Sequence, residues 1–420
     1  MVLRQCHAAA GVLGQAQRRK WNKRRHSENG RGTAPRVGRG PSVLRKPPRR
    51  AVHHDLGRGP TSSDLDLDVV GHHARPDIFD LRTSLRRLTP LTWALVGSRL
   101  VPDVLIPYPP ESLTLPDRLD VHVWEGRPDR SSQNLLSNIG AADLPRPEVL
   151  DRIEFYVIPY GFADDASSLI TRMPRLKAVQ TLTAGYEHVL PYLRDDLTLC
   201  NARGVHDASA AELAVTLTLA SLRGVPAFVR AQEHGDWRQG WYDSLADKTV
   251  LLVGYGAIGQ AIEARLRPFE CDVLRVARSA RDGIAGFASL PELLGRADVV
   301  ILTCPLTEET RGMVDASFLA AMRDGALLVN VARGPVVDTE ALTAEVVSGR
   351  LRAALDVTDP EPLPPGHRLW AQPGVLISPH VGGLSTAFEP RARRLVQSQL
   401  RRLDTGEPLA NIVVGPQVSH

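Results

Sequence analysis

The pattern of hydrophobic and polar residues divides the chain into a long polar stretch followed by regularly spaced apolar segments. From about Pro102 onward, short apolar runs typical of buried strands recur, with polar or helix-like stretches between them. The first of these runs are 104–106, 120–124, 153–158 and 176–180. Strands that alternate with helices indicate a parallel sheet covered by helices.

A second, longer series of strands begins after Lys248. Before it, Asp207 is the predicted N-cap of an apolar helix over 208–222. The run 249–253 is apolar throughout, as expected of a strand buried on both faces. Further strands are predicted at 273–276, 298–302, 327–331, 353–357 and 375–377, and helices at 260–267, 317–322 and 339–348. Six strands with intervening helices predict a doubly wound nucleotide-binding domain, and the chain as a whole is α/β.

Residues 1–98 lack this periodicity and are rich in Arg, Gly, Pro, Ser and His. Residues 1–100 hold twenty Lys and Arg against seven Asp and Glu, whereas the remaining chain holds 31 against 40. Such a basic segment buries too little apolar surface to fold, so a disordered extension is predicted. An inert extension is favoured over a targeting peptide, a membrane-touching arm or, as the runner-up, a nucleic-acid contact.

The body of the chain is predicted to be a cytoplasmic protein without membrane spans. No apolar run approaches the roughly 18–20 residues that a span needs. Four cysteines lie far apart with no C-x-x-C pair, which favours buried thiols over disulfides or a metal site. Motifs of serine hydrolases, zinc proteases and P-loop NTPases are absent from the sequence.

A glycine fingerprint of the form G-x-G-x-x-G follows the strand 249–253 and opens a helix. It consists of Gly254, Tyr255, Gly256, Ala257, Ile258 and Gly259. The first glycine permits a tight turn, the second admits a pyrophosphate, and the third lets helix and strand pack closely. Because the N-terminus of the helix faces the phosphates, the motif predicts a dinucleotide site that binds NAD(P)(H).

The end of the second strand of this domain selects between NAD and NADP. An acidic residue there would hold the ribose 2′-hydroxyl, but the sequence has Arg278, with Arg281 nearby. A guanidinium can bind a 2′-phosphate through two parallel hydrogen bonds. A preference for NADP is therefore predicted, and a solvent-facing Arg278 is the alternative.

Three segments at the ends of later strands carry candidate chemistry. They are 330–334 with Arg333, 356–364 with Asp356 and Glu361, and 378–383 with His380. Together with 304–307 and 310–312, their order and spacing resemble the D-isomer specific 2-hydroxyacid dehydrogenase family, which includes glyoxylate/hydroxypyruvate reductases and phosphoglycerate dehydrogenases. The resemblance spans about 101–409.

The resemblance implies two similar α/β domains with the active site in a cleft between them. Residues 99–206 plus 381–420 would form the substrate domain, and 207–380 the NAD(P)-binding domain. In this family the matching arginine, Arg333, binds the substrate carboxylate and polarises its carbonyl. His380 exchanges the proton, and Glu361 supports it.

Elementary chemistry assigns the same roles. Reduction of a 2-oxo acid needs a hydride, a proton donor and positive charge near the developing alkoxide. Histidine titrates near neutrality, and a carboxylate such as Glu361 would keep His380 protonated. Arg333 presents a planar fork that matches a carboxylate.

Other positions are assigned by the resemblance. The loop 181–186 would bind the substrate carboxylate through backbone N–H groups at Thr183, Ala184 and Gly185. Asp356 would lie near the nicotinamide carboxamide. The remaining positions expected at the cofactor are Cys304, Pro305, Val331, Ala332, His380 and Gly382.

The substrate stays open among glyoxylate, hydroxypyruvate, longer 2-oxo acids and phosphoglycerate-type substrates. Thr358 stands where the family commonly has an aromatic residue, which puts the pocket shape in doubt. The alternative function is a non-catalytic NAD(P)-sensing interaction protein resembling the corepressors of this fold. A homodimer is expected through the cofactor domain and the helix 208–222.

Overall fold

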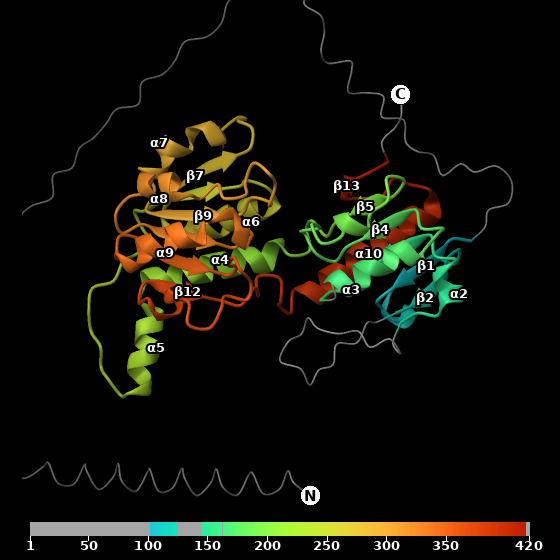
Figure 1. Cartoon of the computed structure of the whole chain (residues 1–420), viewed down its shortest axis with the longest axis horizontal. Coiled ribbons are helices and arrows are strands. Elements are labelled where there is room, and N and C mark those ends of the chain that lie inside the picture. The colour runs from blue at the N-terminus through green and yellow to red at the C-terminus, as the bar shows by residue number, and fades with distance from the viewer. Residues whose placement is uncertain (1–100, 125–143, 162, 417–420) are drawn as a thin grey trace, which may run out of the picture. The chain divides into compact units, whose positions relative to one another are not determined.

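Two sheets of mainly parallel strands organise the computed structural model, which describes residues 101–124, 144–161 and 163–416 (Figure 1). The predicted basic extension 1–98 lies outside these residues. Both predicted α/β sheets are confirmed.

The first sheet has the strand order β13-β5-β4-β3-β1-β2. Its strands are β1 (Asp103–Ile106), β2 (Asp120–Val123), β3 (Phe155–Val157), β4 (Ala178–Gln180), β5 (Thr198–Cys200) and β13 (Ile412–Val414). All neighbours are parallel except β13, which runs antiparallel to β5. Every residue of β3 and β4 is buried, as expected for central strands with helices on both faces.

Alternate residues of these strands face two separate cores. On one face, Val104 and Ile106 pack with Ala392, Val396 and Leu400 of α10 (Phe388–Thr405). The other face is covered by the segment that includes α2 (Pro147–Leu150) and α3 (Ala163–Ser168). Strands are present at all four positions predicted for this sheet, within 104–106, 120–124, 153–158 and 176–180. The sequence did not predict β5, β13 or α10.

The second sheet is parallel throughout, with the order β12-β11-β10-β9-β6-β7-β8. Its strands are β6 (Thr249–Val253), β7 (Asp272–Ala277), β8 (Ala285–Gly286), β9 (Val299–Leu302), β10 (Leu327–Asn330), β11 (Arg352–Leu355) and β12 (Val375–Ile377). The short edge strand β8 makes seven strands where the sequence predicted six.

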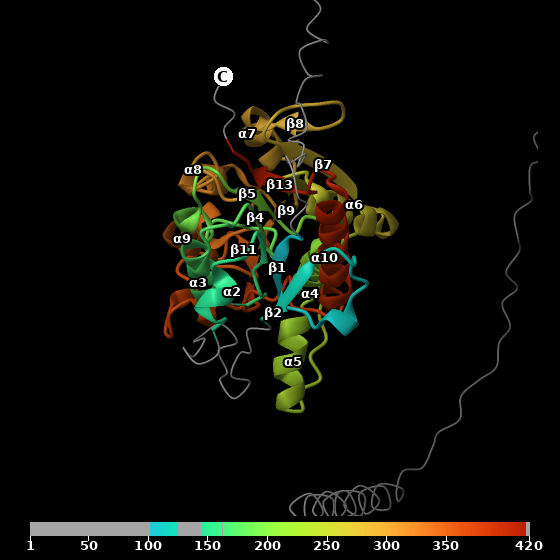
Figure 2. The same cartoon turned by 90° about the vertical axis from the view of Figure 1, so that its right-hand side faces the viewer.

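Helices cover both faces of this sheet (Figure 2). One core includes residues of α7 (Leu290–Leu294), α8 (Ala316–Ala321) and α9 (Thr339–Val347). The opposite core includes α4 (Asp207–Leu222) and α6 (Ala257–Leu266). Since the order turns at β6 and β9, the carboxyl ends of these strands form the switch point where open α/β sheets bind ligands.

The start of α4 differs from the prediction. Asp207 is the first helical residue, and the N-cap is His206, whose side chain makes no capping hydrogen bond. The expected Asp207 cap is therefore wrong. An acidic residue in the first turn still complements the positive end of the helix.

Helix α5 (Val225–Glu233) projects from the second sheet in both views (Figures 1 and 2). Phe228 and Val229 on it are 38% and 53% exposed, and Trp241 beyond it is fully exposed. Among the described residues, no single helix is long and apolar enough to cross a bilayer; only α4 and α5 together reach that composition, across a bend of 66°.

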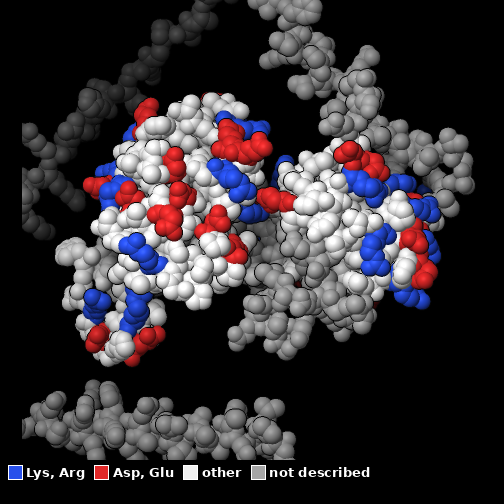
Figure 3. Space-filling model, in the orientation of Figure 1, with Lys and Arg blue, Asp and Glu red and all other residues white. Residues whose placement is uncertain are grey.

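Charged side chains are interspersed on the face shown in Figure 3, where blue and red alternate instead of gathering into one patch of a single sign. The cysteines in the described residues are free: Cys200 and Cys304 are buried, and Cys271 is half-buried. Burial raises the pKa of the Cys304 thiol to about 11, so this thiol is protonated at neutral pH.

Candidate active site

The glycine loop after β6 has the shape that its sequence predicted. Gly254 has φ +102°, and a Cβ there would meet the backbone of Cys304 at 2.5 Å. A Cβ at Gly259 would lie 2.4 Å from the Gly254 carbonyl oxygen, so α6 packs closely on β6. In contrast, no atom of the described chain lies within 4 Å of a Cβ built on Gly256. The position that should admit a pyrophosphate is therefore open, at the N-cap of α6.

The backbone of Tyr255 is part of the glycine loop, whereas its side chain contacts residues of α6 and β7. Its hydroxyl donates to Glu263 on α6, and Arg275 on β7 donates to the same carboxylate at 2.5 and 2.8 Å. Arg275 is the main cause that lowers the pKa of Glu263 to about 2. A charged network thus fixes the loop against both α6 and β7.

The arginines predicted to select the cofactor lie near the end of β7. Arg278 is exposed directly after the strand. Arg281 donates from Nη2 to the carbonyl oxygen of Tyr255 at 2.9 Å, which places a guanidinium at the glycine loop. Cys304, in the loop that follows β9, lies against Gly254, where its backbone N is 2.5 Å from the position of a Cβ.

A tight turn after β10 positions Arg333. The side chain of Asn330 accepts from the N–H of Ala332 at 3.0 Å and donates to the carbonyl oxygen of Arg333 at 3.0 Å. A Cβ at Gly334 would lie 1.9 Å from the carbonyl oxygen of Thr358, so glycine permits this turn to pack against the next loop. Asn330 is a positioning residue that the sequence analysis did not identify.

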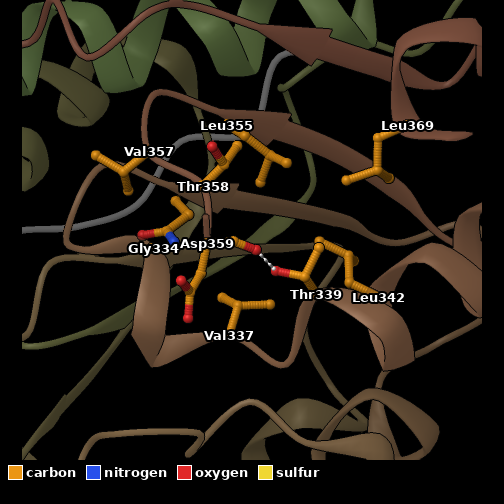
Figure 4. Close-up of a pocket in the computed structure, with 10 residues that line it drawn as sticks. Gly334, Val337, Thr339, Leu342, Leu355, Val357, Thr358, Asp359 and Leu369 are labelled. Carbon is orange, nitrogen blue, oxygen red and sulfur yellow. Dashed lines mark hydrogen bonds between the residues drawn. The ribbon is translucent and has the colours of Figure 1, made fainter. Parts of the chain in front are cut away.

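Figure 4 shows a small pocket behind this turn, lined by residues that include Gly334, Val337 and Thr358. Arg333, Glu361 and His380 are not among the described residues that line it. The pocket therefore lies in the packing around the turn, and none of the three predicted catalytic side chains lines it.

His380 and Glu361, predicted to work together, are in contact. Nδ1 of His380 lies 2.5 Å from Oε1 of Glu361. The hydrogen bond to Glu361 is the main cause that raises the pKa of His380, and it outweighs the opposing effect of burial. Since Nδ1 is engaged, Nε2 is the atom left to exchange a proton with a substrate.

Asp356 holds the loop that carries His380. Its carboxylate accepts from the N–H groups of Val381 at 2.9 Å and Gly382 at 2.8 Å, and from Ser378 Oγ at 2.6 Å. Its backbone carbonyl accepts from the N–H of His380 at 2.8 Å. His380 adopts φ +51°, a conformation that is unfavourable for a non-glycine residue. The hydrogen bonds to Asp356 hold the backbone in it. Asp356 thus supports His380; its predicted contact with nicotinamide stays a prediction.

The substrate loop 181–185 turns all five of its carbonyl oxygens toward protein donors. Four of the carbonyl oxygens accept from one side chain each: Gln180 donates to residue 181, His206 to 182, Asn201 to 184 and Thr183 to 185, at 2.6–2.8 Å. The carbonyl of Thr183 accepts from the N–H of Ala202 at 2.9 Å and from Thr181 Oγ1 at 2.8 Å.

The N–H groups of the same loop are oriented differently. Within the described chain, those of Thr183, Ala184 and Gly185 donate to no acceptor. Consecutive N–H groups without a partner can form a concave anion site. This arrangement is the one that the predicted carboxylate-binding role of the loop requires; the role itself stays a prediction.

Arg333 lies against this loop. A Cβ on Gly185 would lie 1.6 Å from Arg333 Nη2, so only glycine lets the guanidinium approach so closely. Glu187 balances the charge, with 3.7 Å between its Oε1 and Arg333 Nε. The predicted carboxylate loop and the predicted carboxylate-binding arginine are therefore brought together.

The chain is similar to proteins of known family. A family model described as D-isomer specific 2-hydroxyacid dehydrogenase, NAD binding domain, matches residues 215–382. A glyoxylate reductase of Thermofilum pendens is 32% identical over 319 residues, which are 72% of this chain and 90% of that protein. The chain belongs to the D-isomer specific 2-hydroxyacid dehydrogenase family.

Two further members of the family are similar to this chain. Human glyoxylate reductase/hydroxypyruvate reductase is 32% identical over 56% of this chain and 76% of its own length. A D-isomer specific 2-hydroxyacid dehydrogenase of Xanthobacter autotrophicus, solved in complex with NADPH and MES, superposes with a TM-score of 0.55. It is 32% identical, over 63% of this chain and 85% of that one.

Proposed function

We propose that this protein is an oxidoreductase that transfers hydride between NAD(P)H and a small 2-oxo acid, forming the D-2-hydroxy acid. The observation that best supports this proposal is that the Arg333 guanidinium lies against the loop proposed to bind a carboxylate. The second support is that His380 is paired with Glu361. The names of the human and archaeal relatives favour glyoxylate or hydroxypyruvate as substrates.

The cofactor fits the residues present. Gly256 leaves room for a pyrophosphate at the N-terminus of α6, and the close packing at Gly254 and the hydrogen bond from Tyr255 to Glu263 hold the loop in place. When bound, NAD(P)H supplies the hydride. The protein must then place the carbonyl carbon of the substrate and deliver a proton to its oxygen.

In the proposed mechanism the loop and Arg333 bind the substrate carboxylate, and Arg333 also polarises the carbonyl. Negative charge that develops on the oxygen is stabilised by this guanidinium. His380 donates the proton from Nε2, while Glu361 accepts from Nδ1 and stabilises the imidazolium. In the oxidative direction the same nitrogen accepts the hydroxyl proton.

A preference for NADP is also proposed. The support is that a guanidinium, Arg278, stands at the end of β7 where a 2′-hydroxyl would need a carboxylate. A lower KM for NADH than for NADPH would overturn this assignment.

The activity is tested by steady-state reduction of glyoxylate, hydroxypyruvate, pyruvate and longer 2-oxo acids with both cofactors. Turnover with a small 2-oxo acid is expected. A sensor protein of the same fold would bind NAD(P)H without reducing any member of the panel, and that result would reverse the assignment.

The assembly is proposed to be a cytoplasmic homodimer. Its substrate domain would comprise 99–206 plus 381–420 and its cofactor domain 207–380, supported by the division of the strands between two sheets. The contact between the two copies would be made through the cofactor domain and the helix 208–222, and the exposed apolar residues Phe228 and Val229 of the adjoining α5 would extend that surface. Light scattering on the purified chain measures the mass, and a monomer at micromolar concentration would contradict the dimer.

A further inference from the structure

His206 is a buried histidine to which neither the motifs nor the mechanism gave a role. Only 6% of its surface is exposed, and it stands at the N-cap of α4, directly after the first sheet. Its Nε2 lies 2.7 Å from the carbonyl oxygen of Leu182, in the loop proposed above to bind the substrate carboxylate. A carbonyl oxygen only accepts, so Nε2 carries the hydrogen in this bond.

The ring is held in place by two aromatic neighbours. Its centroid lies 5.6 Å from that of Tyr160 and 5.3 Å from that of Phe388, the first residue of α10. Burial is the main cause that lowers the pKa of His206, which leaves the ring neutral at neutral pH. The neutral ring then has one fixed N–H, directed at the loop.

The opposite edge of the ring faces the segment that carries His380. A Cβ added at Gly383 would lie 2.9 Å from His206 Nδ1 and 2.7 Å from the hydroxyl of Tyr160. Nδ1 is buried and makes no well-formed hydrogen bond within the described chain, while the Gly383 backbone beside it partly opposes the lowering of the His206 pKa by burial. A buried polar atom without a hydrogen bond destabilises the fold and calls for an explanation. The hydrogen bond that the other ring nitrogen, Nε2, makes to the loop provides one.

We propose that His206 is a positioning residue for substrate binding: its Nε2–H holds the Leu182 carbonyl inward, so that the following N–H groups face the substrate carboxylate. Reversal of one peptide would direct a carbonyl oxygen, instead of an N–H, at an anion. This inference rests on the proposed function, because it assumes that the loop binds the carboxylate of a 2-oxo acid.

The test measures the binding of oxamate, an unreactive analogue of a 2-oxo acid, to the complex of the full-length protein with NAD(P)H. His206→Phe keeps an aromatic ring but removes the donor, whereas His206→Gln keeps an amide donor that reaches the loop. We expect His206→Phe to weaken oxamate binding by about 2- to 10-fold, the range for one neutral hydrogen bond. His206→Gln should restore it, and the Kd of NAD(P)H should stay constant in both.

Thr218→Val is the matched control, because Thr218 is also buried on α4 and its hydroxyl donates to the carbonyl of Ala214 at 2.8 Å. It should leave oxamate binding unchanged. If His206→Phe does not fold, His206→Gln is compared with His206→Asn, whose amide is one methylene short of the loop and should bind oxamate more weakly.

The outcomes separate the two claims. Oxamate binding by the wild type without turnover of any 2-oxo acid would reject the proposed function and leave the role of His206 standing. Equal oxamate affinity in the wild type and His206→Phe, with turnover intact, would overturn the role of His206 alone. Equal weakening by His206→Phe and Thr218→Val would also overturn it, since it would indicate general loosening of α4.

Discussion

Replacing Glu361 with Gln removes the negative charge beside His380 and keeps nearly the same shape. Because the hydrogen bond to Glu361 is the main cause that raises the pKa of His380, this variant should lower that pKa. Reduction needs protonated His380, so its rate should begin to fall at a lower pH than in the wild type. Oxidation needs neutral His380 and should extend to lower pH.

The magnitude is limited by solvent. The two side chains are 49% and 41% exposed, so the pair contributes about 0.5–1 kcal/mol, or roughly 2- to 5-fold, instead of the value for a buried pair. The variant also orients the imidazole less firmly, which lowers the rate further. The upper limit is the full contribution of a general acid to the rate, about 10²–10⁴-fold. We expect kcat for reduction at neutral pH to fall about tenfold.

The stability of the folded protein also depends on this ion pair. Because the pKa of His380 is raised in the folded state, protonated His380 stabilises the folded protein fully below the unfolded pKa of about 6.5. This stabilisation is lost as pH rises through the folded-state pKa. Glu361→Gln should remove this pH dependence.

The assay is the pH profile of kcat and kcat/KM for 2-oxo acid reduction. Glu340→Gln is the control, because Glu340 lies 4.0 Å from another histidine, His367, and is 88% exposed. An alkaline limb that stayed in place, or moved to higher pH, in Glu361→Gln would refute the reasoning.

Other substitutions test the carboxylate and cofactor sites. Arg333→Lys keeps the charge but loses the planar fork, so KM for the 2-oxo acid should rise about tenfold or more; an unchanged KM would contradict the assignment. Gly185→Ala should displace the guanidinium and raise the same KM, whereas Gly295→Ala, where a Cβ meets only atoms at 3.8 Å or beyond, should be neutral. Arg278→Gln should raise KM for NADPH about 10-fold and leave that for NADH unchanged, as paired titrations will show. Asp338→Ala removes the side-chain cap that accepts from the first turn of α9 and should cost about 1 kcal/mol of unfolding free energy, measured by urea denaturation.

The sequence predicted the second sheet well because its signals are local. Strands such as Thr249–Val253 are continuous apolar runs, and the glycine fingerprint follows one of them directly. In contrast, β5 and β13 have three residues each, and their pairing joins Thr198–Cys200 to a segment more than two hundred residues later. Nothing local in such a short strand identifies its partner.

Helix α10 shows a different limit. Its apolar residues Ala392, Val396, Leu400 and Leu403 have helical spacing, but arginines separate them and lower the average hydrophobicity. Their periodicity was the signal that could have identified the helix.

Motifs predicted the residues that carry charge in the site, and they missed the residues that orient them. Arg333, Glu361 and His380 were predicted from their motifs, and the ion pair between two of them is present. Asn330 and His206 act through backbone carbonyls, a role that any donor of suitable reach can fill and that leaves no fixed spacing. Only the folded chain reveals them.

The most direct test of the account is the rate of 2-oxo acid reduction by His380→Gln at saturating NAD(P)H. We predict a fall of about 10²–10⁴-fold in kcat, with the Kd of the cofactor unchanged. Reduction at the wild-type rate would show that the proton comes from another group and would contradict the mechanism.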